Sequence, residues 1–529
     1  MRERYVEVAE ATTMWGLLER RSDLTPDAPM LVDEHDRSVS FAAAKAWAQR
    51  VAAGLHEAGV GPGTAFTWQL PTRIETVILS MALARLGAVQ NPVISLYRQR
   101  EVASLLHATR AEWYAVLSQW RGFDYLAMAE AMQAESPTPF QVLLIDDGLP
   151  EGDPARLPPA PTDGDAVRWL YSTSGTTSEP KAVRHTDATL MAGGTGISIA
   201  LQPRPDEMAA LPFPFAHIGG PDQMCMTLRT GIPSLLMESF VPSEAVKVLD
   251  RAGATTLGGS TAHYLGLLQE RRRDPDMVVP RKMRTLTGGG APKPPEVYWQ
   301  VKAELGLEIH HGYGMTECPM IAMGAIGDTD EQLAHTEGRP VHGCEIRVLD
   351  DTGNPAPAGV DGDLEVRGPM LAKGYTDPAL TAESFRPDGW FRTGDRGHLR
   401  ADGHVVVTGR TKELIIRKGE NISPREIEDL LMTLPQVAAA AVIGLPDPER
   451  GELVCAVVEA PPSLPALTFA EMRAACLAAG LMPQKVPERL EVVTELPRNP
   501  TMKVLKSVLV ERYSPTPVTG SQPQAGSTS

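Results

Sequence analysis

Residues 171–181 read Tyr171-Ser172-Thr173-Ser174-Gly175-Thr176-Thr177-Ser178-Glu179-Pro180-Lys181. Hydroxyl side chains, backbone N–H groups freed by glycine and one lysine are the groups that a loop needs to hold a polyphosphate. The segment lacks the G-x-x-x-x-G-K-[ST] spacing of a Walker A loop, so a P-loop ATPase is excluded on pattern. A Ser/Thr-rich surface turn is the alternative that composition alone leaves open.

Helix and strand patterns alternate on the N-terminal side of this segment. Residues 40–58 place apolar side chains at helical spacing before Gly59, and residues 65–70 follow as a buried strand. A second helix over 72–86 precedes an extended segment at 88–93. Such alternation predicts a parallel sheet covered by helices on both faces, and therefore an α/β fold.

Two further regions are predicted on the C-terminal side. Short strands and Asp-Gly or Pro-Gly turns between residues 345 and 407 predict a β-rich subdomain. Beyond residue 409, capping boxes and strand patterns predict a small α+β domain; the boxes lie at 423–426 and 468–471, and the strands at 439–443, 453–459 and 490–493. We expect a layered N-terminal domain over 1–409, a hinge at 410–412, a mobile C-terminal lid domain over 413–513 and a disordered tail over 514–529.

Composition narrows the classes of protein and of partner. The 529 residues suffice for several domains, and 43% hydrophobic with 22% charged residues is usual for soluble chains. A net charge of -16 argues against nucleic-acid binding. Five cysteines without paired spacing indicate neither a disulfide framework nor a zinc site, which favours the cytoplasm. No transmembrane segment is expected, because the apolar stretch at 76–89 is short and contains Arg85.

Five more segments form an ordered set with residues 171–181. They are TGGGAP (287–292), HGYGMTE (311–317), WFRTGD (390–395), GRTKELII (409–416) and PRNPTMK (497–503). Together the six resemble the motifs of the adenylate-forming superfamily, which includes acyl-CoA synthetases, luciferase-like enzymes and the adenylation domains of peptide synthetases. The resemblance spans about residues 10–512 and implies an enzyme that uses ATP, Mg²⁺ and a carboxylic acid.

The resemblance implies a set of residues that bind ATP and AMP. Tyr313 would pack on adenine, Thr316 would contact the α-phosphate, and Asp395 would take the ribose hydroxyls. Thr176 and Glu317 would hold magnesium. The whole set is Thr173, Ser174, Gly175, Thr176, Thr177, Lys181, Gly289, Gly290, Ala291, Pro292, His311, Gly312, Tyr313, Gly314, Met315, Thr316, Asp395, Arg410 and Lys503.

The resemblance also implies the catalytic and acyl-binding groups. Catalysis would fall to Lys503, Glu317, Thr176 and His217, with the hinge at Lys412. The acyl group and coenzyme A would be bound by His217, Gly219, Gly220, Ser260, Lys418 and Gly419. The reaction implied has two steps: formation of an acyl-adenylate, and attack of a thiol on its acyl carbon. One lysine far beyond the hinge does not serve both steps from a single position, so we expect the lid to rotate about residues 410–412. The family usually has glycine before this lysine, whereas this chain has Met502, which restricts the backbone.

The expected activity is that of an ATP-dependent acyl-CoA synthetase. Free coenzyme A is favoured as acceptor because no carrier-protein segment is apparent after Lys503. Paired glycines at 219–220 and 258–259 are expected to leave room for a fatty or a bulky alicyclic or steroid side-chain acid. In the amino-acid-activating members of the superfamily, an aspartate near the pocket binds the α-amino group. Asp222 is the nearest candidate for it, so amino-acid activation is left open. Further alternatives are an adenylating enzyme that loads a carrier protein and a non-catalytic nucleotide-binding protein, and a homodimeric state is left open.

Overall fold

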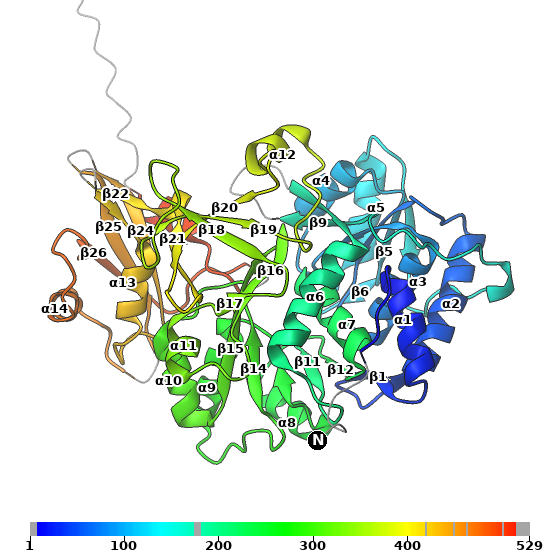
Figure 1. Cartoon of the computed structure of the whole chain (residues 1–529), viewed down its shortest axis with the longest axis horizontal. Helices are drawn as coiled ribbons and strands as arrows, with labels where there is room; N and C mark the ends of the chain where they lie inside the picture. The colour runs from blue at the N-terminus through cyan, green and yellow to red at the C-terminus, as the bar shows by residue number, and fades with distance from the viewer. Residues whose placement is uncertain are drawn as a thin grey trace, which may run out of the picture. The chain divides into compact units, whose positions relative to one another are not determined.

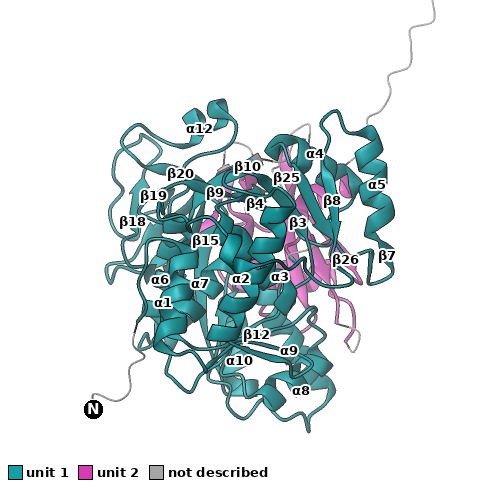
Figure 2. Ribbon diagram, turned by 90° about the vertical axis from the view of Figure 1, so that its right-hand side faces the viewer, with its two compact units in different colours: residues 1–407, 500–502 teal, residues 408–499, 503–529 magenta. Residues whose placement is uncertain are grey.

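The computed structural model describes residues 8–173, 181–417, 420–447, 450–461, 464–499 and 502–514. The chain divides into two compact units, which Figure 2 distinguishes by colour. Unit 1 comprises Met1–Val407 and Pro500–Met502, and unit 2 comprises Thr408–Asn499 and Lys503–Ser529. Each unit has a hydrophobic core of its own.

The largest sheet of unit 1 consists mainly of parallel strands. Its order is β17-β16-β15-β14-β13-β11-β12-β1-β2, and the pairing is parallel from β1 to β15 and antiparallel for β2, β16 and β17. The strands are β1 (Pro29–Asp33), β2 (Ser38–Ser40), β11 (Ala209–Leu211), β12 (Ser234–Leu236), β13 (Thr256–Leu257), β14 (Thr285–Gly288), β15 (Glu308–Met315), β16 (Cys318–Met323) and β17 (Arg339–Pro340).

A second sheet of unit 1 has the order β10-β9-β4-β3-β5-β8. All of its pairs are parallel except that of β10 with β9, which form an antiparallel hairpin. The strands are β3 (Ala65–Gln69), β4 (Val89–Pro92), β5 (Trp113–Val116), β8 (Gln141–Leu144), β9 (Val167–Thr173) and β10 (Lys181–Thr186). The predicted parallel sheet is therefore confirmed, with one antiparallel strand, β10, at its edge.

Helices lie between these two sheets and on their outer faces (Figure 1). Helix α3 packs against β1 and β4, and α6 packs against β16 and β10, so each contacts both sheets. The ring of Trp68 stacks on Phe215 in the core between them, with 5.9 Å between centroids. The helices of unit 1 are α1 (Met14–Leu24), α2 (Phe41–Glu57), α3 (Ile74–Leu86), α4 (Gln99–Thr109), α5 (Tyr125–Glu135), α6 (Asp187–Leu201), α7 (Gly219–Thr230), α8 (Pro242–Ala252), α9 (Thr261–Arg273), α10 (Pro295–Leu305), α11 (Asp330–His335) and α12 (Pro378–Ser384).

A smaller antiparallel sheet follows in the chain, where the sequence predicts a β-rich subdomain. Its order is β18 (Glu345–Leu349), β19 (Gly362–Arg367), β20 (Phe391–Leu399) and β21 (Val405–Arg410). Glu365 anchors it, because this carboxylate is 2% exposed and pairs with Arg347 and Arg386, both at 2.6 Å. The remaining elements of unit 1 are the ribbon of β6 (Gln119–Trp120) with β7 (Phe123–Asp124) and a 3₁₀ turn at Pro154–Arg156.

Unit 2 is an α+β fold, as predicted. Strand β25 (Gly451–Glu459) pairs antiparallel with β24 (Ala439–Asp447) and with β22 (Ile415–Arg417), and in parallel with β26 (Arg489–Val493). Strand β23 (Glu420–Ile422) pairs antiparallel with β22. Its helices are α13 (Pro424–Leu431), α14 (Phe469–Ala478) and α15 (Lys506–Tyr513), with a 3₁₀ turn at Thr411–Glu413.

One predicted capping box forms in unit 2 and the other does not. Thr468 Oγ1 accepts from the Glu471 amide, and Glu471 returns a bond to the Thr468 amide, so α14 begins as predicted. The box predicted at Ser423 is wrong, because the Ser423 hydroxyl donates instead to the Thr408 carbonyl.

The fold class read from the sequence is confirmed: a large N-terminal α/β domain of sheets and helices and a small C-terminal domain. Within the described ranges, no helix is both long and apolar enough to cross a membrane.

Candidate active site

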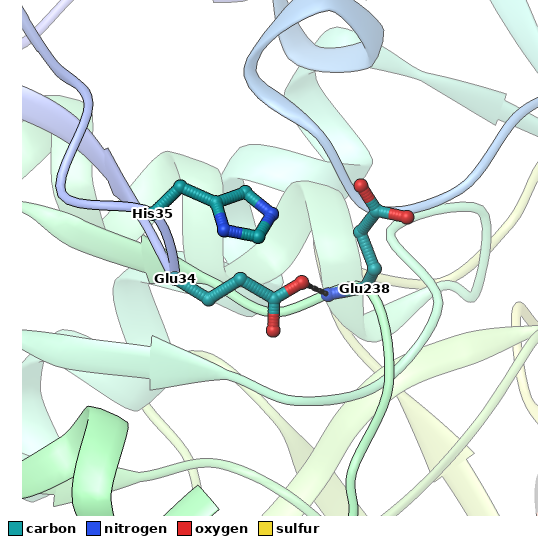
Figure 3. Close-up of side chains that lie close together, drawn as sticks. All are labelled: Glu34, His35 and Glu238. Atoms are coloured by element: carbon teal, nitrogen blue, oxygen red, sulfur yellow. Dashed lines mark hydrogen bonds between the residues drawn. The ribbon is translucent and has the colours of Figure 1, made fainter. Parts of the chain in front are cut away.

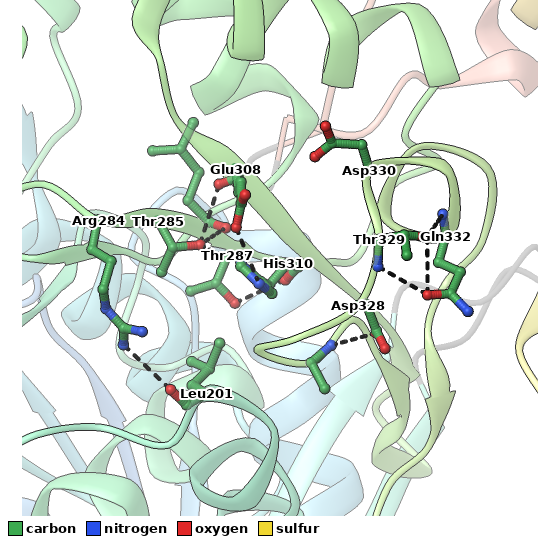
Figure 4. A network of polar contacts seen from close by, with 12 residues as sticks. Leu201, Arg284, Thr285, Thr287, Glu308, His310, Asp328, Thr329, Asp330 and Gln332 are labelled. Carbon is green, nitrogen blue, oxygen red and sulfur yellow. Dashed lines mark hydrogen bonds and ion pairs between the residues drawn. The ribbon is translucent and has the colours of Figure 1, made fainter.

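Strand β15 carries the predicted tyrosine motif and is fixed to β14 by side chains as well as by backbone pairing. The Thr285 hydroxyl bonds to His310 Nδ1 at 2.6 Å, and Thr287 Oγ1 donates to the His310 carbonyl at 3.1 Å (Figure 4). Burial lowers the pKa of His310 to about 4, so its ring is neutral at pH 7. The two strands therefore keep the predicted adenine-side loop, residues 287–292, beside residues 311–317.

The glycines of the adenine-side loop allow backbones to meet. Gly288 has a φ of +133°, and a Cβ there would overlap the carbonyl of Gly259. At Gly289 a Cβ would overlap the carbonyl of Gly312. Three segments of the chain thus meet at distances that only glycine permits. The structure brings together Gly289 and Gly312, both predicted to bind nucleotide.

The side chain of His311 contacts the adenine-side loop. Its ring is buried at 3% exposure, and Nε2 lies 3.0 Å from the carbonyl oxygen of Ala291 and 3.7 Å from Glu337. Tyr264 packs edge-on against the same ring. The side chain of His311 therefore holds the loop in position, and Pro292 is held similarly by a 2.7 Å bond from the Thr261 hydroxyl to its carbonyl.

Tyr313 and Asp395 meet although 82 residues separate them. The Tyr313 hydroxyl donates to Asp395 Oδ2 at 2.7 Å, and the Asp395 amide donates to Thr393 Oγ1 at 3.0 Å. Burial, followed by the charge of Asp395, raises the pKa of Tyr313 well above its ordinary value, so the phenol remains a donor. This bond fixes the predicted adenine and ribose residues relative to each other.

Thr316 is held by a histidine that the motif analysis missed. His185 on β10 is fully buried, with Nε2 2.7 Å from the Thr316 carbonyl and Nδ1 2.8 Å from Thr189 Oγ1. Burial lowers the pKa of His185 to about 4, so the neutral ring donates from Nε2 and accepts at Nδ1. Strand β10, which follows the predicted phosphate loop, is thereby tied to the Thr316-Glu317 turn.

Glu317 is oriented by Tyr375, which the sequence analysis also missed. The Tyr375 hydroxyl donates to Glu317 Oε1 at 2.7 Å, and the Glu317 carbonyl accepts from the Ala372 amide at 2.9 Å. Burial and the nearby carboxylate raise the pKa of Tyr375. Neither His185 nor Tyr375 belongs to a residue pattern, since each acts through a single contact across the fold.

The donor set at Glu317 fits a magnesium ion that arrives with nucleotide phosphates. Oε2 makes no hydrogen bond with any described residue, so one carboxylate oxygen remains for a cation. Mg²⁺ usually takes one or two protein carboxylates and completes its octahedron with phosphate and water oxygens. The second predicted ligand, Thr176, lies outside the described residues.

Residues Glu34, His35 and Glu238 form a second group of metal-ligand type (Figure 3). Glu34 Oε1 accepts from the Glu238 amide, while the Glu238 carboxylate pairs with Arg73 and accepts from Trp120 Nε1 at 3.0 Å. Arg73 already balances the charge of Glu238, so an ion pair accounts for this group.

The phosphate loop itself is described only at its two ends. Thr173 ends β9 and Lys181 begins β10, and these residues face each other across the hairpin. The predicted residues Ser174, Gly175, Thr176 and Thr177 lie outside the described residues.

On the acyl side, His217 lies just before α7. Its Nδ1 accepts from the Gly219 amide at 3.3 Å, and Phe213 packs edge-on against the ring. Burial lowers the pKa of His217 to about 4. A Cβ at Gly220 would overlap the Phe215 carbonyl. The expectation that this glycine pair leaves volume is therefore corrected at Gly220, where the missing side chain admits backbone.

Ser260, predicted to contact the acyl group or coenzyme A, is occupied within the fold. Its hydroxyl and its amide both lie 3.1 Å from His263 Nδ1 at the start of α9. A Cβ at Gly259 would lie 2.9 Å from the same imidazole. The second glycine pair, 258–259, thus also admits neighbouring atoms.

In unit 2 the predicted catalytic lysine closes a tight turn. The Lys503 amide donates to Asn499 Oδ1 at 2.9 Å, and the Asn499 amide donates to the Lys503 carbonyl at 2.8 Å. Met502 has a φ of +65°, in the left-handed region that glycine adopts without strain. The chain therefore keeps the backbone shape expected of glycine at the position where the sequence departs from the family.

Basic residues of unit 2 gather around Glu413. Burial opposes ionisation of this carboxyl, but the charges of Lys506, Arg410 and Lys503 lower its pKa. The structure thus brings the predicted nucleotide residue Arg410 near Lys503. Lys412 is exposed one residue before Glu413, whereas Lys418 and Gly419 lie outside the described residues.

Comparisons with known proteins identify the family to which this chain belongs. The family model described as AMP-binding enzyme matches residues 18–376, and the one described as AMP-binding enzyme C-terminal domain matches residues 426–503. A salicyl-AMP ligase / salicyl-S-ArCP synthetase of Mycobacterium tuberculosis is 30% identical over 92% of this chain and 88% of its own length. A medium-chain fatty-acid–CoA ligase of Escherichia coli is 28% identical over 92% and 87%.

A solved structure agrees with these relatives. The ATP-bound MatB of Rhodopseudomonas palustris superimposes with a TM-score of 0.84 and 28% identity, covering 95% of this chain and 99% of that one. The chain therefore belongs to the AMP-binding enzymes of the adenylate-forming superfamily, of the acyl- and aryl-CoA ligase type.

Proposed function

We propose that this protein is an ATP-dependent acyl-CoA synthetase, which activates a carboxylic acid as acyl-AMP and transfers the acyl group to coenzyme A. The observation that carries the proposal is the 2.7 Å bond between Tyr313 and Asp395, with Glu317 held by Tyr375 on the same motif. A protein that only binds nucleotide has no need of a carboxylate kept available beside the phosphate region.

The first half-reaction brings two anions together. The acid's carboxylate oxygen bonds to the α-phosphorus of ATP, the bond from that phosphorus to the bridging oxygen breaks, and pyrophosphate leaves. Tyr313 and Asp395 would orient the nucleoside, and Lys503 would stabilise charge on the transferring group. When bound at Glu317 and Thr176, magnesium would neutralise phosphate charge.

The second half-reaction needs a thiol. Its sulfur bonds to the acyl carbon, the bond to the AMP oxygen breaks, and the thiol proton is lost. Lys503 belongs to unit 2, and we propose that rotation about residues 410–412 withdraws it after the adenylate forms.

Coenzyme A is the proposed acceptor. Unit 2 has a hollow of about 470 Å³ whose lining includes Arg473, the half-exposed Phe469, and Arg417 and Arg450, which both pair with Glu488 in the same lining. A guanidinium group beside an aromatic ring, here Arg473 and Phe469, suits a phosphate and the adenine of a nucleotide handle. A carrier-protein acceptor is the alternative, supported by the name of the mycobacterial relative, a salicyl-AMP ligase / salicyl-S-ArCP synthetase.

We propose two classes of carboxylic acid as the substrate. Fatty and bulky alicyclic or steroid side-chain acids follow from the sequence, and the Escherichia coli relative supports the fatty class. An aromatic acid is the second candidate, because neighbouring atoms fill the space at Gly220 and Gly259, and the mycobacterial relative is named for salicylate.

The test is pyrophosphate release by the full chain with Mg-ATP across fatty, alicyclic, steroid side-chain and aromatic acids, followed by thioester detection with coenzyme A. Glu317→Gln should abolish release, whereas Glu304→Gln, a change at a surface ion pair, should not. Release without thioester would favour a carrier-protein acceptor, tested with a phosphopantetheinylated carrier. ATP binding without acid-dependent release by any acid would favour the non-catalytic alternative.

A further inference from the structure

A hollow of about 270 Å³ in unit 1 is lined by none of the residues predicted to bind nucleotide, acid or coenzyme A. It lies between the end of α12 and the start of β20 (Figure 1), where the Arg386 amide donates to the Trp390 carbonyl at 2.7 Å and closes a turn. The lining is Ala382, Phe385, Arg386, Pro387, Asp388 and Arg392. Two of these six side chains are guanidinium groups, so the hollow is suited to an anion.

The guanidinium groups around this hollow outnumber the carboxylates that pair with them. Glu365 on β19 is buried, and it pairs with Arg386 at 2.6 Å and with Arg392 at 3.8 Å. Arg347 pairs with the same carboxylate at 2.6 Å and with Asp388 at 3.5 Å. Three arginines therefore share two carboxylates, which leaves an excess of one positive charge in this cluster.

Both arginines of the lining keep donors that the described residues do not use. Nε of Arg386 donates to Glu365, while Nη1 and Nη2 of Arg386 make no hydrogen bond with a described residue. Arg392 donates from Nη1 to the Glu383 carbonyl at 2.6 Å, and its Nη2 makes no such bond. The two side chains are 32% and 50% exposed, so a ligand from solvent can reach them. Guanidinium donors form a planar fork that matches the oxygens of an oxyanion.

One wall of the hollow contacts a residue that orients the active-site carboxylate. Phe385 lines the hollow and packs edge-on against Tyr375, with 5.9 Å between ring centroids. The Tyr375 hydroxyl donates to Glu317 Oε1. Strand β20, which begins beside the hollow, also carries Asp395. A ligand in the hollow would therefore contact elements that hold two residues predicted to act on ATP.

We propose that this hollow binds a phosphate-type oxyanion through Arg386 and Arg392. The site uses none of the residues assigned to ATP, the acid or coenzyme A, so the inference goes beyond the proposed function. Asp388 is the one carboxylate of the lining, and its pairing with Arg347 offsets its charge. Two guanidinium groups from different residues suit a tetrahedral phosphoryl group, which offers an oxygen to each. Inorganic phosphate, pyrophosphate and phosphate monoesters share this chemistry.

The test measures how fast phenylglyoxal modifies individual arginines of the full chain, by peptide mass spectrometry and without ATP or acid. The probes are inorganic phosphate, pyrophosphate and glycerol 3-phosphate at millimolar concentrations, with acetate as a carboxylate probe and sodium chloride to match ionic strength. At a probe concentration about ten times the Kd, modification of Arg386 and Arg392 should slow about tenfold, because only unoccupied sites react. Arg156, whose side chain is 71% exposed, is the internal control and should react at an unchanged rate.

A pair of variants tests whether the two arginines act together. Arg386→Gln removes one guanidinium group, while Glu365 keeps two hydrogen bonds from Arg347. The ratio of Arg392 modification rates without and with the probe should then fall to about one. Arg367→Gln is the matched control, because Arg367 pairs with Glu345 at 2.7 Å and does not line the hollow, so Arg392 should remain protected. Thermal unfolding of both variants checks that they fold.

The probes distinguish the sources of the anion: protection by inorganic phosphate, by pyrophosphate alone or by glycerol 3-phosphate alone would each support the site and identify its ligand. Absence of protection with all three, equal slowing at Arg156, or protection of Arg392 that survives Arg386→Gln would overturn it. Protection by acetate as strong as that by phosphate would overturn the assignment to phosphate. None of these outcomes depends on the ligase activity, because no ATP is present.

Discussion

In unit 1, the residues predicted to bind nucleotide and the buried carboxyl group near the predicted acyl-side His217 differ in whether the protein supplies their hydrogen-bond partners. On the nucleotide side, Tyr313 bonds to Asp395 and Tyr375 bonds to Glu317, so the protein orients these groups itself. On the acyl side, Asp222 is buried with an unpaired oxygen. Tyr313, Asp395 and Glu317 are thus oriented by contacts within the protein, whereas one oxygen of Asp222 is not.

Lys503→Ala gives the largest expected effect and tests whether nucleotide chemistry is independent of the acid. Adenylation should fall by about 10²–10³-fold, the usual loss for one charge-stabilising donor. The fall should be equal for every acid, because Lys503 is proposed to stabilise charge on the transferring phosphoryl group and not to contact the rest of the acid. Transfer from supplied acyl-AMP to coenzyme A should persist, and equal loss of both half-reactions would contradict the assigned role. Lys247→Ala, at a side chain 67% exposed, is the control.

Tyr313→Phe should break the prearranged pair at the nucleotide side. Hydrogen bonds to charged groups contribute about 1.5–3 kcal/mol, so the KM for ATP should rise at least about tenfold. The rise should not depend on the acid. If Asp395→Asn adds nothing to Tyr313→Phe, the two residues act as a unit, and full additivity would show that they do not. Tyr97→Phe is the control, since the Tyr97 hydroxyl bonds to no described residue.

Asp222→Asn tests, through the pH dependence of stability, how much the buried carboxyl group of Asp222 destabilises the folded state. The folded pKa of Asp222 is raised, so the native state binds a proton that the unfolded state releases near its ordinary pKa of about 4. Wild-type stability should therefore decline as the pH rises above about 4, and it should not recover as the pH rises through the folded pKa.

The asparagine variant lacks this decline. Its unfolding free energy relative to wild type should increase as the pH rises above about 4, measured by urea unfolding without ligand. Asp206→Asn, the same change at an exposed loop aspartate, should show no such trend. A pH-independent difference would mean that Asp222 carries no raised pKa.

Met502→Gly gives the smallest expected effect. Relief of the left-handed backbone is worth about 1–2 kcal/mol, but the added freedom of glycine in the unfolded chain offsets part of it, so unfolding should shift by less than about 1 kcal/mol. Met502→Ala keeps the strain and should not stabilise. Destabilisation by glycine would show that the methionine side chain contributes more than its backbone costs.

Much of the fold could be predicted because it rests on local patterns. The helix predicted over 40–58 appears as α2, and the strand predicted over 65–70 appears as β3. The capping box at Ser423 could not be predicted to fail, since the competing acceptor, the Thr408 carbonyl, lies 15 residues away in the chain. The role of the glycine pairs was misjudged for the same reason: a sequence does not reveal which backbone approaches a missing side chain.

The sequence alone determined the alternation of helices and strands and the order of the nucleotide motifs, because side-chain period, turn residues and motif spacing are properties of neighbouring residues. Only the tertiary structure decided that His185 holds Thr316, that Tyr375 orients Glu317, and that Asp222 is buried without a donor. The first two facts depend on contacts between residues 131 and 58 positions apart, and the third depends on which side chains a helix faces. Burial converts them into pKa shifts and unpaired acceptors that no local pattern encodes.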